Sequence, residues 1–93
     1  MEEKIMTLHP EGKNGVNILK RRYDLIRDTL LNILAQTGEI EFRELSNMVI
    51  AALAGKFDGK ILWYIVTVKQ DLEARGLVEK VAKSSPQRIR LKN

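Results

Sequence analysis

The hydrophobic periodicity of the chain changes at Gly76. Before this glycine, apolar residues recur every three or four positions, which is the spacing of one face of an α-helix. After it, Arg88-Ile89-Arg90-Leu91 alternates polar and apolar side chains, the pattern of a strand with one buried face. A chain of 93 residues is long enough for one domain and too short for two. The sequence therefore predicts one mostly helical α+β domain.

Three amphipathic helices are predicted before Gly76, over residues 17–36, 42–55 and 58–75. Asn17 and Asp58 are expected to cap the first and third helices with their side chains. Gly76 is expected to end the third helix in a Schellman motif. The predicted apolar stripes are Leu19, Tyr23, Ile26, Leu30 and Ile33 in the first helix, Phe42, Leu45, Val49 and Leu53 in the second, and Ile61, Ile65, Val68 and Leu72 in the third.

The segments outside the helices differ in character. Residues 1–16 are predicted to be a loosely ordered arm, because proline and glycine residues interrupt any regular period. Residues 39–41 have room for a single strand bridge, and residues 77–81 and 87–91 form a predicted hairpin around the turn at Ser84-Ser85-Pro86. The folded domain is accordingly placed at residues 17–93.

The net positive charge of the chain lies in its last fifteen residues. Residues 79–93 hold five cations and one anion, whereas residues 1–78 hold eleven Lys/Arg and eleven Asp/Glu, so this hairpin carries the whole net charge of +4. A cationic hairpin on a neutral body is the charge layout of a module that contacts a polyanion. This interpretation requires that the hairpin arginines are not occupied by acids of the same chain. The five cations are Lys80, Lys83, Arg88, Arg90 and Lys92.

The segment Asp71-Leu72-Glu73-Ala74-Arg75-Gly76-Leu77-Val78-Glu79-Lys80 resembles the winged-helix regulator superfamily. The resemblance in element order covers residues 18–92, and residues 63–79 also resemble small uncharacterised bacterial proteins of this group. It implies a winged helix-turn-helix with three helices and a C-terminal two-stranded wing. It also implies that residues 58–75 form the recognition helix, which lies in the major groove of DNA while the wing contacts phosphate.

The leading functional prediction is therefore binding of double-stranded DNA, as a transcriptional regulator. Neutralising about four to six phosphates predicts a slope of roughly −4 to −5 for log K against log salt. A single copy offers a small footprint, so a dimer on two half-sites is expected. The candidate DNA-binding residues are Arg43, Lys60, Thr67, Gln70, Lys80, Lys83, Arg88 and Arg90.

Trp63 and Val66 favour a different function. Both are expected on the outward face of the third helix, beside Thr67 and Gln70, and neither suits a base-reading surface. An exposed tryptophan beside a valine more often marks packing against another segment or subunit. The alternative prediction is a protein–protein interaction or dimerisation module that uses the Trp63/Val66 face without nucleic acid.

Other classes of function have little basis in the residues. The chain has no cysteine and a single histidine, His9, so no metal site or cofactor is expected. No serine, histidine and carboxylate combination suits catalysis, and an enzyme is not expected. No apolar run approaches the ~18 residues of a membrane span and the N-terminus lacks a signal-peptide pattern, so the prediction is a cytoplasmic protein.

Overall fold

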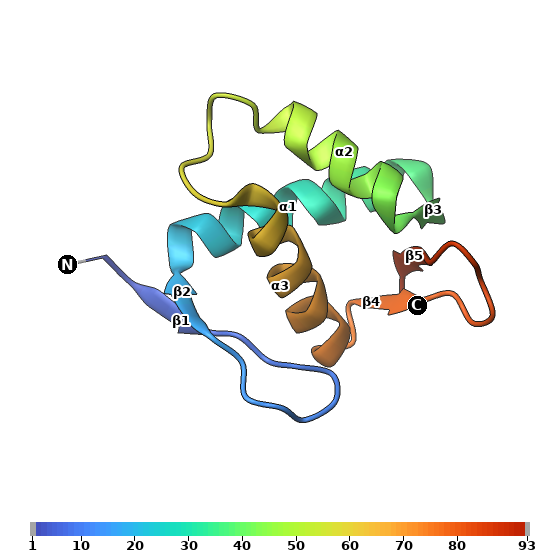
Figure 1. The fold of residues 1–93 in the computed structure, drawn as a ribbon, viewed down its shortest axis with the longest axis horizontal. Coiled ribbons are helices and arrows are strands. Elements are labelled where there is room, and N and C mark those ends of the chain that lie inside the picture. The colour runs from blue at the N-terminus through green and yellow to red at the C-terminus, as the bar shows by residue number, and fades with distance from the viewer. Residues whose placement is uncertain (1, 93) are drawn as a thin grey trace.

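Most residues of the predicted apolar stripes are buried in the core, whereas Leu19 lies in the strand Asn17–Leu19 before the first helix and, like Phe42 and Ile61, is half-buried. In the computed structural model, which describes residues 2–92, α1 spans Lys20–Thr37, α2 spans Phe42–Ala52 and α3 spans Ile61–Ala74 (Figure 1). Helix α1 packs against both α2 and α3, and the buried faces of the three helices form one core. Their buried apolar side chains are Tyr23, Ile26, Leu30, Ile33 and Leu34 from α1, Leu45 and Val49 from α2, and Ile65, Val68 and Leu72 from α3.

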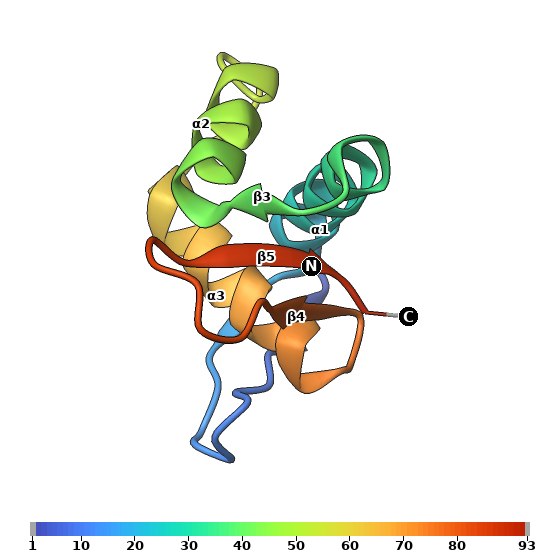
Figure 2. The ribbon, with the colours of Figure 1, turned by 90° about the vertical axis from the view of Figure 1, so that its right-hand side faces the viewer.

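The C-terminal segment forms the predicted hairpin, and the predicted bridge before α2 joins it. Strands β3 (Ile40–Glu41), β5 (Arg88–Leu91) and β4 (Val78–Lys80) make an antiparallel sheet in the order β3-β5-β4 (Figure 2). Ile40 lies opposite Ile89, and both side chains are buried in the core. The α+β class is therefore confirmed, with three helices and a small antiparallel sheet.

Helix α3 ends as predicted. Gly76 adopts a φ of 77°, a left-handed conformation that glycine takes without a steric penalty. The Leu77 N–H donates to the Leu72 carbonyl at 2.9 Å, and the Gly76 N–H donates to the Glu73 carbonyl at 3.1 Å. These two bonds define a Schellman motif and turn the chain from α3 into β4.

The start of α3 differs from the prediction. The helix begins at Ile61, and the side chain of Asp58 does not cap it. The Asp58 carboxylate instead accepts hydrogen bonds from Arg21 and Arg22 of α1 at 3.0 to 3.1 Å. These arginines hold the pKa of Asp58 well below its usual range, chiefly through the hydrogen bonds. Asp58, which was predicted to cap α3, therefore links the connection between α2 and α3 to α1 through hydrogen bonds.

The N-terminal segment also differs from the loosely ordered arm that was predicted. Strand β1 (Lys4–Met6) pairs antiparallel with strand β2 (Asn17–Leu19), and Ile5 lies opposite Ile18. Ile18 is buried, so this two-stranded ribbon is attached to the core. Asn17 belongs to the ribbon and does not cap α1, which begins at Lys20 without a side-chain cap. We call residues 4–19 the N-terminal hairpin.

Gly15 allows the two sides of the N-terminal hairpin to approach closely. The Thr7 N–H donates to the Val16 carbonyl at 2.8 Å, and the Val16 N–H donates to Thr7 Oγ1 at 2.9 Å. A Cβ atom on Gly15 would lie 1.8 Å from the Thr7 carbonyl oxygen, which no side chain can tolerate. The absence of a side chain at Gly15 is thus a condition for this hairpin.

Replacing Gly15 with alanine should open the N-terminal hairpin while leaving the β3-β5-β4 sheet intact. We expect Gly15→Ala to lose hydrogen-exchange protection at the Thr7 and Val16 amides, because the new methyl group overlaps the Thr7 carbonyl. Gly12→Ala is the matched control: its φ of 74° costs about 1 kcal/mol for alanine, but the added atom meets nothing within 4 Å. Equal loss of protection in both variants would contradict this role of Gly15.

Candidate functional site

The outward face of α3 is the candidate functional surface, and the N-terminal hairpin covers part of it. The side chains of Trp63 and Leu62 are 46% and 55% exposed. Those of Thr67 and Gln70, which lie beside the loop of the N-terminal hairpin, are half-buried. Figure 1 places this loop alongside the C-terminal half of α3. The loop and the helix enclose a groove of about 190 Å³. Its lining residues are Thr7, Leu8, His9, Asn14, Gly15, Val16, Trp63, Thr67 and Gln70.

A buried carboxylate fixes the hairpin against α3. Asp71 is fully buried, and its Oδ1 accepts the Leu8 N–H at 2.8 Å. Its Oδ2 accepts hydrogen bonds from the Tyr23 hydroxyl and, at 2.8 Å, from Arg75 Nε. Helix α1, helix α3 and the hairpin therefore meet at one side chain. Burial, together with the hydrogen bond to Asp71, raises the pKa of Tyr23 to about 12.

The sequence pattern did not indicate this cluster. Asp71 was counted only as part of the charged segment that ends α3, and Tyr23 only as a member of the apolar stripe of α1. Two signals could have found it. Asp71 lies directly beside the buried Leu72 and four residues before Arg75, which is the spacing of a helical ion pair. The corresponding signal for the hairpin is an isoleucine at the centre of each strand, with Lys4 and Met6 exposed beside Ile5 and Asn17 exposed beside Ile18.

Arg88 and Arg90 of the C-terminal hairpin point away from the core, but acids of the same chain occupy them. Arg88 Nε donates to Glu39 Oε2 at 2.8 Å, and Arg90 Nε donates to Glu79 Oε2 at 2.8 Å. Lys80 Nζ lies 3.9 Å from Glu73 Oε2. Three of the five cations of the C-terminal hairpin are thus paired. The polyanion interpretation required arginines that are free of acids from the same chain, and neither Arg88 nor Arg90 is free.

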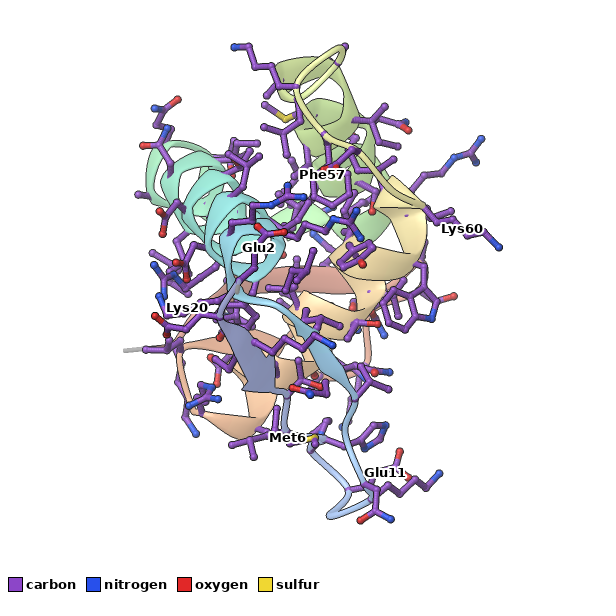
Figure 3. All side chains as sticks on the ribbon, turned by 90° about the vertical axis from the view of Figure 1, so that its left-hand side faces the viewer. Glu2, Met6, Glu11, Lys20, Phe57 and Lys60 are labelled. Atoms are coloured by element: carbon purple, nitrogen blue, oxygen red, sulfur yellow. The ribbon has the colours of Figure 1, made fainter. Side chains whose placement is uncertain are left out.

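Other candidate cations are exposed and lie apart from one another. Arg43 lies in the first turn of α2, Lys60 immediately precedes α3, and Lys83 sits in the β4–β5 turn with a φ of 60°. Within residues 2–92 none of the three forms an ion pair, and Glu39 pairs with Arg88 and Arg90. Figure 3 shows Lys60 extending away from the body of the molecule, at some distance from Met6 and Glu11 of the hairpin.

Val66 and Trp63 lie on the same outward surface but differ in exposure. Val66 is half-buried, whereas the Trp63 ring is exposed and meets the Tyr64 ring edge-on, with centroids 5.0 Å apart. Tyr64 is in turn fixed by Phe57, whose ring centroid lies 5.1 Å away, and by a hydrogen bond from Arg22 at 2.8 Å. Trp63 is therefore the dominant apolar group on this face, and its neighbour holds it in place.

Residues 2–92 contain neither a metal-binding cluster nor a membrane-spanning helix. No group of three or more His, Cys, Asp or Glu side chains in this range is placed to hold a metal ion, and His9 Nδ1 accepts the Glu11 N–H at 3.2 Å. No helix in the described range has the length and apolar character needed to cross a membrane.

The structure defines a small α+β protein with a partly covered helix face. Over residues 4–89 the sequence matches a family described as a family of unknown function (DUF6958), and the chain belongs to this family. Neither the curated proteins nor the solved structures gave a match to the sequence.

The Asp71 cluster generates a prediction about stability. Tyr23→Phe removes a hydrogen bond to a buried carboxylate, and we expect it to lower the free energy of unfolding at pH 7 by about 2 kcal/mol. Because the pKa of Tyr23 is about 12 in the folded chain and about 10 when unfolded, this stabilisation is present below pH 10 and is lost as the pH rises through 12. The stability difference between the two proteins should shrink over that range.

Urea unfolding at a series of pH values measures this difference. Tyr64→Phe is the matched control, since the Tyr64 hydroxyl has only the partly exposed Arg22 as its partner, and that arginine keeps Asp58. A loss as large in Tyr64→Phe as in Tyr23→Phe would show that the Asp71 cluster has no special importance.

Proposed function

We propose that the protein is a winged helix-turn-helix module that binds a protein chain through the outward face of α3, without a requirement for nucleic acid. The element order α1-β3-α2-α3-β4-β5 supports the winged-helix assignment. The pairing of β3 with β5, the second strand of the C-terminal hairpin, supports it as well. The N-terminal hairpin is an addition to that pattern.

The exposed indole of Trp63 is the observation that carries this proposal. Tryptophan is enriched among residues that dominate protein–protein binding, because it offers a large rigid contact area with few rotatable bonds. Trp63 is 46% exposed, and the groove that it shares with the N-terminal hairpin contains no carboxylate, ammonium or guanidinium group, whereas Arg22 and Lys60 lie on its other side. The groove therefore suits an apolar partner and offers a phosphate no lysine or arginine.

The charges of the wing support the same proposal. Glu39, Glu73 and Glu79 lie within 4 Å of the cations on β4 and β5, although Glu73 is nearer to Lys69, so these acids offset much of the positive charge of the two strands. Exposed ion pairs contribute only about 0 to 1 kcal/mol each, so a phosphate could displace them, but the glutamates would remain beside it. The attraction expected of a cationic wing is thereby much reduced.

Binding of double-stranded DNA is the second candidate, and Arg43, Lys60 and Lys83, which form no ion pair among residues 2–92, favour it. They belong to the start of α2, the start of α3 and the wing turn, the three places from which a winged helix contacts the DNA backbone. With about three phosphates neutralised, the salt slope would be about −3, shallower than the value expected from the sequence. A role as a transcriptional regulator rests on this second candidate.

The fluorescence of Trp63 separates the two candidates, because it is the single tryptophan of the chain. We expect its emission to move to shorter wavelength as the protein concentration rises, since contact with another copy removes the indole from water. Random-sequence duplex DNA at low salt should leave the emission unchanged. A shift that depends on DNA and disappears with added salt would instead support DNA binding and contradict the proposal.

Releasing Arg88 and Arg90 from their glutamates should strengthen DNA binding. In the double variant Glu39→Gln, Glu79→Gln, Arg88 and Arg90 lose their acidic partners, and the salt slope of DNA binding should steepen by about 2. The control Glu3→Gln, Glu44→Gln removes the same charge from two glutamates that, within the described residues, pair with no cation and do not face Arg88 or Arg90 across the sheet, so it should change the slope little. Anisotropy of a labelled duplex measures both, and equal slopes for the two variants would show that the ion pairs are irrelevant to DNA binding.

A further inference from the structure

The groove between the N-terminal hairpin and α3 differs from the rest of the molecular surface. Three of its lining residues, Leu8, Val16 and Trp63, are large apolar groups that are 44%, 38% and 46% exposed. The remaining side chains are hydroxyl, amide and imidazole groups, and none carries a carboxylate, ammonium or guanidinium. Thirty per cent of the chain is charged, so a surface of this kind without charge is a distinct feature.

We propose that this groove is the contact surface between two copies of the chain, with Leu8 and Val16 of the N-terminal hairpin acting together with Trp63. The inference rests on the proposed function. It adds that the partner is a second copy of the chain and that the N-terminal hairpin, together with α3, forms the interface. The sequence indicated only the helix face for this role, since residues 1–16 were not expected to be ordered.

The distribution of charge favours a second copy as the occupant. Two identical chains each carry a net charge of +4 and repel one another, and an uncharged contact surface adds no like-charge contacts to that repulsion. The groove provides such a surface, whereas the wing and the start of α2 do not. A polyanion gains no charge contact there, and an acidic or basic partner would gain none either.

The hydrogen-bonding groups of the groove are also self-complementary. A two-fold interface brings the same patch of both chains together, so each polar group must find a partner among its own set. The amides of Gln70 and Asn14 each donate and accept, and the Thr67 hydroxyl does the same. Matching therefore requires no second kind of surface.

The Asp71 cluster makes the hairpin part of a preformed interface. The Leu8 N–H is held by the buried Asp71 carboxylate at 2.8 Å, and Asp71 is held in turn by Tyr23 and Arg75. The backbone at Leu8 is thus fixed relative to α3 before a second copy arrives. Binding to a surface that is already ordered avoids much of the entropy loss of association.

Sedimentation equilibrium of the full chain tests this inference. We expect a monomer–dimer equilibrium whose Kd rises at least about tenfold in Trp63→Ala and in the double variant Leu8→Ser, Val16→Ser. The control Met48→Ser, Leu77→Ser removes two apolar groups of similar exposure, 42% and 43%, from outside the groove, and its Kd should stay within about twofold. Circular dichroism establishes that each variant keeps its helical content.

The outcomes separate this inference from the proposed function. If Trp63→Ala weakens the dimer but Leu8→Ser, Val16→Ser does not, the hairpin contribution is wrong and the proposed function stands. If a dimer forms and Trp63→Ala leaves it unchanged, the α3 face is not the interface and both fail. A wild-type chain that remains monomeric at millimolar concentration overturns the second copy as partner, while a partner of another sequence remains open to the proposed function.

A cysteine-labelling experiment keeps the inference testable if a serine variant fails to fold. The chain contains no cysteine, so a single introduced thiol reports on one position. Maleimide labelling of Gln70→Cys should slow as the protein concentration rises, because Gln70 lines the groove. Lys56→Cys, in the exposed connection between α2 and α3, should react at a constant rate. Equal behaviour of the two thiols would overturn the proposed interface.

Discussion

The arrangement of this protein around α3 depends on the buried carboxylate of Asp71. A charged group without access to water is costly unless hydrogen bonds compensate it, and removing one partner of such a group destabilises a protein more than the loss of an exposed pair. Asp71 satisfies its two oxygens with Tyr23, Arg75 and the Leu8 N–H. These partners come from α1, from the end of α3 and from the N-terminal hairpin. One side chain consequently determines where the hairpin lies relative to the helix face.

The register of the C-terminal sheet determines which acids lie beside Arg88 and Arg90. Glu79 lies directly opposite Arg90 in the β4–β5 pair, and Glu41 lies opposite Arg88 in the β3–β5 pair. Opposite charges that face each other across antiparallel strands attract, so Arg90 turns to Glu79 while Arg88 reaches the neighbouring Glu39. The charge excess of the last fifteen residues is real, but it is spread over a surface to which other segments contribute acids. A linear count of charges does not include these neighbours.

The parts of the fold that were predicted correctly are those that local sequence determines. The stripes of α1, α2 and α3 and the glycine at position 76 act through neighbours within a few residues, and the Arg88–Leu91 alternation specifies its own buried face. The errors concern long-range partners. Asp58 has the side chain of a helix cap but lies near two arginines from 36 and 37 residues earlier in the chain, and their charges attract it more strongly than the helix terminus does.

The candidate site was predicted less completely for the same reason. Trp63, Thr67 and Gln70 were placed on the correct face from helical periodicity, but their surroundings come from the hairpin, which joins α3 through contacts 63 residues apart in the chain. The polar composition and the glycines of residues 9–15 are compatible with either a disordered arm or a turn between short strands. Only the partner of Ile5 decides between them, and that partner, Ile18, had been assigned to a helix.

The setting of Trp63 explains how a single exposed aromatic residue can serve recognition. Its ring meets the Tyr64 ring at 84°, a favourable edge-on geometry, and Tyr64 is itself held by Phe57 and Arg22. One edge of the indole thus rests on a ring that is itself held in place, while nearly half of the side chain is open to a partner. On one side of Trp63 lies the groove bounded by Leu8 and Val16, and on the other the cationic start of α3 at Lys60. A partner that approaches α3 meets the apolar groove only if the hairpin is in place, which makes the order of the N-terminal segment a condition for the surface and not an accessory to it.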